Sequence, residues 1–121
     1  MCNSQTKQEC FCYRVFGLPL AKKDLVEKVK TRMNLFLYDF NLRLMYGIYK
    51  AASSGRMNLE PNAFRASKRS FPAQVRFRIQ KDCLPLSEDI FKKAIKNNYT
   101  DKNRFIFELN FQQVKKVTEL F

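Results

Sequence analysis

Four cysteines are the residues of this chain whose side chains most readily do chemistry. Thiolates hold a structural zinc ion when four of them converge, usually as two pairs with two or more residues between the members of each pair. Here one residue separates Cys10 from Cys12, whereas Cys2 and Cys83 each stand alone. The polar start of the chain is also unlike a secretory signal. We therefore expect reduced thiols in an intracellular protein, cytoplasmic or nuclear, with no metal and no cofactor.

Side chains suited to catalysis are few. The chain contains no histidine, which is the commonest general base and the usual partner of a nucleophilic serine or cysteine. Its three glycines are isolated and cannot form a phosphate-binding loop. The adjacent Glu88 and Asp89 are expected at the N-terminus of a helix, where negative charge is favourable. We therefore expect that the chain is not an enzyme.

Positive charge is concentrated in one stretch. The formal net charge is +12, and residues 43–81 hold nine basic side chains and one acidic one, Glu60. Such a stretch favours an acidic partner such as nucleic acid, although basic residues can also serve only to keep a domain soluble. Tyr46 and Tyr49 could stack on a base beside it. The candidate binding surface consists of Arg43, Lys50, Arg56, Arg65, Lys68, Arg69, Arg76 and Arg78.

Apolar periodicity predicts helices at both ends of the chain and strands between them. We expect a turn or short helix over residues 6–16 that ends at Gly17, and a helix over residues 22–30. Strands are predicted over residues 34–40, 44–51, 73–83 and 105–109, with an irregular stretch over residues 53–70. A helix should follow Ser87 as its cap, and a capping box of Asn110 with Gln113 should begin a C-terminal helix. No apolar run approaches the ~20 residues that cross a bilayer, so no membrane partner is expected.

Alternation along the strands predicts which side chains are buried. Leu35, Leu37, Val75, Phe77 and Ile79 should meet in one core, and Gly47 should mark a bulge or a close approach of two backbones. The opposite face of the strand over residues 73–83 is polar. Arg76 and Arg78 should therefore face solvent.

Four short motifs occur in a fixed order along the chain. Each motif has a local backbone explanation, as a helix stop and turn, a buried strand, a strand opening, or a capped junction between strand and helix. We therefore interpret the first, third and fourth motifs as structural rather than as a ligand site. The motifs are Phe16-Gly17-Leu18-Pro19, Leu35-Phe36-Leu37, Pro72-Ala73-Gln74-Val75 and Pro85-Leu86-Ser87-Glu88.

Taken together, the four motifs resemble the plant DCD (development and cell death) domain over roughly the whole chain. The resemblance implies one domain over residues 1–121. It also implies a non-catalytic protein-interaction module, with a protein partner, in plant proteins of stress responses and programmed cell death. Domains of this family usually begin with a short strand ahead of the segment that starts here at Met1. We therefore expect that first strand to be truncated and an edge of the sheet to be exposed.

The order of elements predicts an α+β fold in a single domain. We expect a small mixed or antiparallel sheet, or a partly closed barrel, flanked by helices at both ends. This pattern is similar to that of the PUA-like barrels, which include the YTH and EVE domains. The alternative function is therefore an RNA- or nucleic-acid-binding domain that uses the basic face of residues 43–81. A YTH-like cage for a methylated base typically draws on tryptophan, which this chain lacks. A base-binding pocket built from tyrosine and phenylalanine is kept as the alternative.

Overall fold

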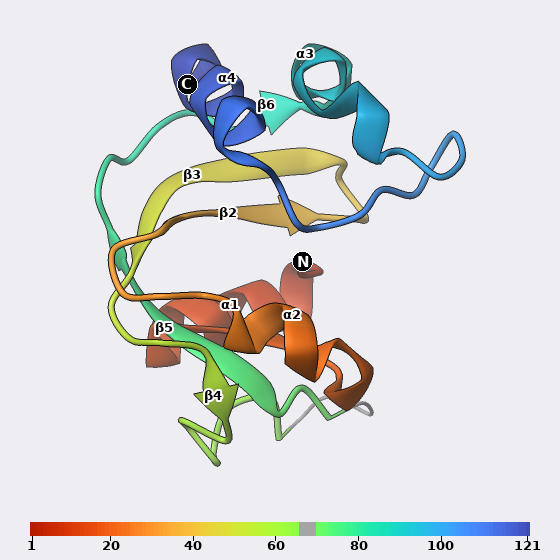
Figure 1. Cartoon of the computed structure of the whole chain (residues 1–121). Coiled ribbons are helices and arrows are strands. Elements are labelled where there is room, and N and C mark those ends of the chain that lie inside the picture. Colours follow the sequence, from red (N-terminus) through yellow and green to blue (C-terminus); the bar gives the residue numbers. More distant parts are fainter. Residues whose placement is uncertain (66–69) are drawn as a thin grey trace.

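The computed structural model describes residues 1–65 and 70–121 and contains an open antiparallel sheet with helices packed against it (Figure 1). The strand order is β1-β5-β3-β2, with β4 beside β5 and β6 beside β3. The predicted α+β fold is confirmed, and the sheet does not close into a barrel. The strands are β1 Val15–Leu18, β2 Asn34–Asp39, β3 Leu44–Ala51, β4 Arg56–Met57, β5 Ala73–Ile79 and β6 Leu86–Ser87.

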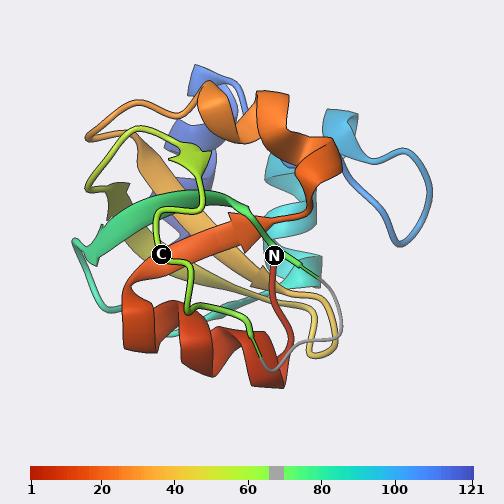
Figure 2. The same cartoon turned by 90° about the horizontal axis from the view of Figure 1, so that it is seen from below.

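The helices lie on both sides of the sheet. In Figure 1, α3 and α4 lie beyond β2 and β3, on the side away from α1 and α2, and Figure 2 shows α1 and α2 on opposite sides of β5. Within the described ranges, no helix combines the length and the apolar character that a membrane crossing requires. The helices are α1 Ser4–Tyr13, the 3-10 turn η1 Leu20–Lys22 with α2 Lys23–Glu27, α3 Glu88–Phe91 with the 3-10 turn η2 Lys92–Asn98, and α4 Phe111–Leu120.

Local sequence explains where the two long helices begin. Asn3 and Thr6 form a capping box at the start of α1, because the Asn3 side chain accepts from the Thr6 N–H and the Thr6 hydroxyl accepts from the Asn3 N–H. The predicted capping box of Asn110 with Gln113 at α4 is confirmed. Each box satisfies two backbone donors that would otherwise lack a partner at a helix N-terminus.

The prediction that the first helix ends at Gly17 is wrong. That helix ends at Tyr13, since Arg14 takes the left-handed conformation with φ 56°, and the chain then pairs with β5 as β1. Gly17 is therefore a strand residue. An added Cβ there would lie 2.7 Å from a ring atom of Phe64, so this position needs glycine for packing rather than for a helix stop.

Four other predictions about strands need correction. The irregular stretch over residues 53–70 contains β4, and β6 forms inside the expected junction before α3. The strand predicted over residues 105–109 does not form, and this segment makes one isolated bridge, from Tyr99 to Phe105. β5 ends at Ile79 rather than at residue 83. Alternation alone cannot reveal whether a neighbouring strand is present to pair with.

Among the described residues, the core consists of three apolar clusters. Leu35, Leu37 and Phe77 meet in one of them, as predicted, and Val75 is buried as well. Ile79 is 41% exposed, so its predicted burial is wrong, because β5 ends there beyond the packed part of the sheet. Gly47 lies at the register shift between β2 and β3, where an added Cβ would lie 2.9 Å from the ring of Phe121. The predicted bulge is confirmed.

Candidate functional site

A cavity of about 290 Å³ lies between the two end strands of the sheet, β1 and β2. We call it the inter-strand cavity. Most of its lining side chains are apolar. They come from β1, β2, β5, α2 with the loop after it, and the segment over residues 105–109, with Met45 of β3 and Val114 of α4. Three of the four motifs contribute residues to this lining. The residues are Phe16, Gly17 and Leu18 of the first motif, Leu35 and Phe36 of the second, and Ala73 and Val75 of the third.

This convergence extends the structural interpretation of the motifs. Each motif does serve the backbone locally, but β1, β2 and β5 also place parts of three motifs around one cavity. Sequence reasoning missed this because the residues concerned are separated by up to about sixty positions. The signal that could have found it is the apolar character of Leu35 and Phe36 on both faces of β2, which is typical of a strand without a solvent face.

One wall of the inter-strand cavity is an extended segment held by two side-chain amides. The Asn98 Nδ2 donates to the carbonyl oxygens of Ile106 and Glu108, at 2.9 Å each, and the Gln113 Nε2 donates to Asn98 Oδ1 at 2.8 Å. Glu108 also pairs with Lys28 of the loop after α2 at 3.3 Å. This ion pair is exposed and contributes little stability. The amides of Asn98 and Gln113 therefore set the position of this wall.

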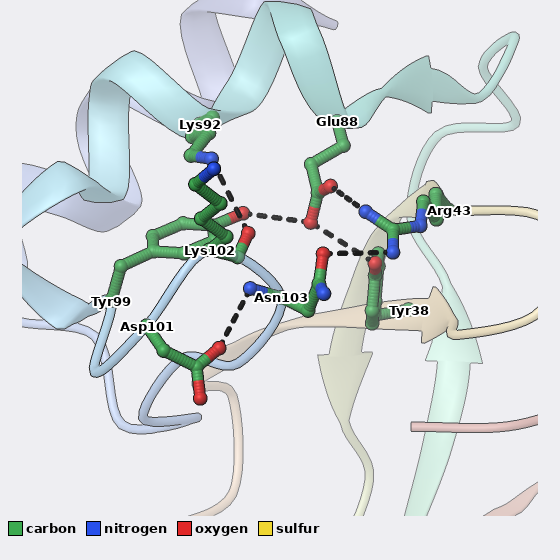
Figure 3. Close-up of polar contacts among 8 residues, drawn as sticks. All are labelled: Tyr38, Arg43, Glu88, Lys92, Tyr99, Asp101, Lys102 and Asn103. Atoms are coloured by element: carbon green, nitrogen blue, oxygen red, sulfur yellow. Dashed lines mark hydrogen bonds and ion pairs between the residues drawn. The ribbon is translucent and has the colours of Figure 1, made fainter.

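The fourth motif lies elsewhere, and its Glu88 is the centre of a polar network (Figure 3). Glu88 Oε2 accepts from the hydroxyls of Tyr38 at 3.2 Å and Tyr99 at 2.9 Å, while Oε1 accepts from Arg43 at 2.9 Å. The same guanidinium donates to Asn103 at 2.9 Å. The side chain of Glu88 is 10% exposed. This carboxylate therefore holds side chains together inside the fold, in addition to its predicted role as negative charge at a helix N-terminus.

The network keeps both tyrosines protonated. Burial, reinforced by the Glu88 carboxylate, raises the pKa of Tyr38 to about 12, and burial with the hydrogen bond to Glu88 raises the pKa of Tyr99 as well. Both hydroxyls therefore remain donors to Glu88 at physiological pH. Figure 3 shows Asp101 and Asn103 in the loop beside them, where Asp101 accepts from the Asn103 N–H at 2.8 Å. The cap predicted at Ser87 does not form through its side chain.

The structure divides the predicted basic surface. Arg43 is bound by Glu88, and Arg76 donates to the Leu59 carbonyl oxygen at 2.9 Å and lies 4.0 Å from Glu60. The two side chains are 51% and 42% exposed, respectively, so Arg43 and Arg76 stay candidate binding residues, although each already has a partner in the fold. Lys68 and Arg69 lie outside the described residues.

A smaller basic row remains. Lys50 of β3 and Arg78 of β5 are direct neighbours in the register, and Arg78 is exposed, as are Arg56 and Arg65. Among the described residues, no ion pair is formed by any of these four side chains. Like charges that face each other across two strands repel, so an anion at this place would relieve the repulsion.

Neither of the two tyrosines predicted to stack on a base has a fully exposed ring. Tyr49 is 5% exposed and packs edge-on against Phe11, Phe16 and Phe77, so its proposed role in stacking on a base is wrong. Tyr46 is partly buried, and the Lys7 ammonium lies 3.6 Å from its ring centroid. One face of Tyr46 is therefore already covered.

The cysteines are distributed over the fold. Cys2 and Cys10 are buried in different apolar clusters, Cys12 is exposed, and Cys83 is partly buried. Burial raises the pKa of Cys2 to about 11 and that of Cys10 to about 12. In the part of the chain that the structure describes, no three side chains of histidine, cysteine, aspartate or glutamate come together in a way that could hold a metal ion.

Comparison with known proteins identifies the family. The model of the development and cell death domain matches residues 1–121. The chain is 38% identical to the DCD domain-containing protein NRP of Arabidopsis thaliana, 34% to the B2 protein of Daucus carota and 34% to the DCD domain-containing protein NRP-B of Glycine max, in each case over 100% of its own length. It covers 35%, 59% and 37% of those relatives, respectively. The chain therefore belongs to the development and cell death (DCD) domain family.

Proposed function

We propose that residues 1–121 act as a non-catalytic protein-interaction module of an intracellular plant protein that takes part in stress responses and programmed cell death. Membership in the DCD family supports the cell-death context. The interaction role is carried by one observation, the meeting of three family motifs at the inter-strand cavity. An apolar cavity with few polar groups is the usual form of a binding site.

Two neighbouring residues allow a matched test of this role. Phe107 lines the inter-strand cavity, whereas Ile106 is 55% exposed and is not part of its lining. Phe107→Asp therefore places a carboxylate in the cavity, and Ile106→Asp places the same group on the surface of the same segment. The wild-type domain and both variants serve as bait in plant-cell extract, and captured proteins are then purified and titrated by calorimetry.

The expected result is one purified protein that binds the wild type and Ile106→Asp equally. We expect Phe107→Asp to bind at least about tenfold more weakly, a loss of about 1.4 kcal/mol. Equal binding to all three proteins would move the interaction away from the cavity. Failure of every purified candidate to bind the wild type would contradict an interaction module.

A second candidate function is nucleic-acid binding through the basic row. The neighbouring Lys50 and Arg78, with no ion pair among the described residues, are the observation that favours it. The double variant Lys50→Glu with Arg78→Glu should then abolish binding to RNA, and wild-type binding should weaken steeply with salt. The matched control, Lys115→Glu with Lys116→Glu, makes the same change of net charge on exposed positions of α4. Equal loss in both double variants would show a non-specific effect of net charge.

A further inference from the structure

Strands β3 and β4 lie one after the other along the same edge of β5, with a bulge between them (Figure 1). Ala51 of β3 pairs with Phe77, and Arg56 of β4 pairs with Gln74. The four residues 52–55 therefore face only two residues of β5. We call residues 52–55 the β3–β4 bulge. Bulges of this kind interrupt strand pairing and are frequent beside functional sites.

Both ends of the β3–β4 bulge are fixed in position. At one end, the Ser53 hydroxyl accepts from the Arg76 N–H at 3.1 Å, in place of a backbone carbonyl. At the other end, the Gly55 N–H donates to the Val29 carbonyl oxygen at 3.1 Å, in the loop after α2. A Cβ added to Gly55 would overlap the Val26 carbonyl oxygen, so only glycine fits there. The backbone between these ends is therefore held in place before any ligand binds.

The middle of the bulge carries hydrogen-bond donors without acceptors. The N–H groups of Ser53 and Ser54 and the Ser54 hydroxyl form no hydrogen bond with an acceptor in the described part of the chain. Both serines are partly exposed. Successive backbone N–H groups in a turn are a common way to bind an anion. The β3–β4 bulge therefore offers donors that suit the oxygens of an anion.

Three positive side chains surround these donors. Lys50 precedes the bulge, Arg56 follows it, and Arg78 is the direct neighbour of Lys50 across β3 and β5. Cross-strand partners share a face of the sheet, and so do alternate residues of one strand, which places all three side chains on the same face. None of the three forms an ion pair among the described residues. Their charge is therefore available to a ligand at the bulge.

This concentration of charge favours a phosphate monoester over a carboxylate. A phosphorylated side chain carries about −1.5 to −2 charges at pH 7 and three strong acceptor oxygens. A carboxylate of aspartate or glutamate has a single charge and two oxygens. Three cations with several free donors therefore match the monoester better.

The surroundings favour a single phosphate group over a nucleic-acid chain. Nucleic acid binds along a track of cations, and single strands also stack their bases on exposed rings. Arg76, the next arginine on the same face of β5, is directed to the Leu59 carbonyl oxygen and lies 4.0 Å from Glu60. The Glu60 carboxylate repels a second phosphate at that position. Tyr46 and Tyr49 provide no fully exposed ring.

We propose that the β3–β4 bulge binds the phosphate group of a phosphorylated side chain in a partner protein. Lys50, Arg56 and Arg78 neutralise the phosphate, while the free donors of Ser53 and Ser54 bond to its oxygens. The bulge shares no residue with the lining of the inter-strand cavity. The inference rests on the proposed protein-interaction function for the kind of partner, and it adds a second surface whose occupation depends on phosphorylation.

The experiment uses three libraries of nine-residue peptides with blocked ends and random sequence around a fixed central residue. The central residue is phosphoserine, phosphotyrosine or glutamate. We expect the folded domain to select peptides from a phosphorylated library and none from the glutamate library. In NMR titrations with a selected peptide, the amide protons of Ser53 and Ser54 should move downfield, because each gains a charged acceptor.

A matched pair of double variants tests the cations. Lys50→Gln with Arg78→Gln should bind the selected phosphopeptide at least about tenfold more weakly than the wild type. Lys115→Gln with Lys116→Gln changes the net charge equally on exposed positions of α4 and should bind like the wild type. Equal weakening in both double variants would reduce the effect to net charge and overturn the site. Wild-type thermal unfolding in the first double variant confirms that it is folded.

Further probes decide between the possible ligands. Inorganic phosphate that binds as tightly as the selected peptide, with the same shifts at Ser53 and Ser54, would overturn the assignment to a partner protein. Tighter binding of a twelve-nucleotide uridine RNA, with the same loss in Lys50→Gln with Arg78→Gln, would assign the surface to nucleic acid instead. Glutamate peptides that bind equally well would refute the requirement for phosphate.

The outcomes also separate this site from the inter-strand cavity. Phe107→Asp should bind the selected phosphopeptide as the wild type does, because Phe107 lines the cavity and not the bulge. A loss of phosphopeptide binding in Phe107→Asp would place the peptide at the cavity and refute the bulge site. If neither phosphorylated library yields a binder, the bulge site is refuted, while the bait experiment above still tests the interaction function.

Discussion

The two edges of β2 differ in how completely they are paired with other strands and covered by packed side chains. On one side β2 pairs with β3, and above them α3 and α4 close an apolar cluster in which Phe91, Ile95 and Val117 are 0% exposed. On the other side, the pairing found among the described residues is the Cys2 bridge, and this edge borders the inter-strand cavity. The four motifs divide along the same line. Glu88 anchors the closed side, and the other three motifs contribute to the cavity.

The difference separates a motif that stabilises the fold through Glu88 from three motifs that meet at a cavity, for which we propose a role in recognition. The Glu88 network has a partner for each carboxylate oxygen, which is the arrangement that a buried charge requires. The inter-strand cavity combines an apolar lining with the buried Asn34 Oδ1, which forms no hydrogen bond in the described part of the chain. Four measurements test this comparison, from the largest expected effect to the smallest.

Truncation of a phenylalanine should cost far more on the closed side. Phe91→Ala removes a ring that is 0% exposed and should lower the free energy of unfolding by about 3–5 kcal/mol. Phe107→Ala removes a partly exposed ring of the cavity wall and should cost less than about 1.5 kcal/mol. Urea unfolding of both variants measures the two values. Equal losses would mean that the cavity wall is as tightly packed as the helical side.

Hydrogen exchange should separate neighbouring amides of the same strand. The Tyr38 carbonyl oxygen accepts from Cys2, so by alternation the Tyr38 N–H points to the edge of β2 away from β3, whereas the Leu37 N–H points toward β3. We expect the Tyr38 amide to exchange at least about 100-fold faster than the Leu37 amide. The Leu37 amide is paired within the sheet and exchanges only when the sheet opens. Comparable protection of the two amides by NMR would show that the edge is already covered.

Glu88→Gln should destabilise the closed side without unfolding it. The amide keeps the shape but replaces one acceptor oxygen by a donor, so Arg43 or a tyrosine hydroxyl loses its partner. The expected loss is about 1–2 kcal/mol. The neighbouring Asp89 is exposed, and Asp89→Asn should change stability by less than about 0.5 kcal/mol. A loss as large in Asp89→Asn would mean that helix-terminal charge, rather than the network, stabilises this region.

The stability should also respond to alkaline pH through Tyr38. Its pKa is raised from the ordinary value of 10.0 to about 12 in the folded protein, chiefly by burial. The unfolded chain therefore loses this proton first, and the stabilisation is lost as pH rises from about 10 to 12. Thermal unfolding over this range should show a shallower fall in Tm for Tyr38→Phe than for the wild type. An identical slope would contradict the raised pKa of Tyr38.

Several features of the fold were predictable because their causes are local. The capping boxes of Asn3 with Thr6 and of Asn110 with Gln113 are formed by side chains three residues apart. The strand of residues 44–51 and the bulge at Gly47 follow from alternation and from a residue without a side chain. The four motifs likewise identified the family from the sequence alone. The capping pattern of Asn3 with Thr6 itself was not used for prediction, although it could have located the start of α1.

The features that sequence reasoning missed depend on contacts between distant residues. Arg76 and Arg78 have the same charge and lie on the same face of β5, yet only Arg76 finds the Leu59 carbonyl oxygen and Glu60 within reach. Residues 105–109 alternate like a strand, but Asn98 holds them beside the sheet as a cavity wall. Alternation specifies which side chains can be buried, whereas only the path of the chain specifies which partner is near.

Composition and local pattern by themselves determined the family, the α+β class and the excess of positive charge, because each follows from residue types and short spacings. The tertiary structure alone decided that Tyr49 is buried, that Arg43 is bound by Glu88, and that three motifs meet at one cavity. These outcomes require pairing of strands far apart in the chain. Burial and hydrogen-bond partners are properties of the packed chain, and no local pattern records them.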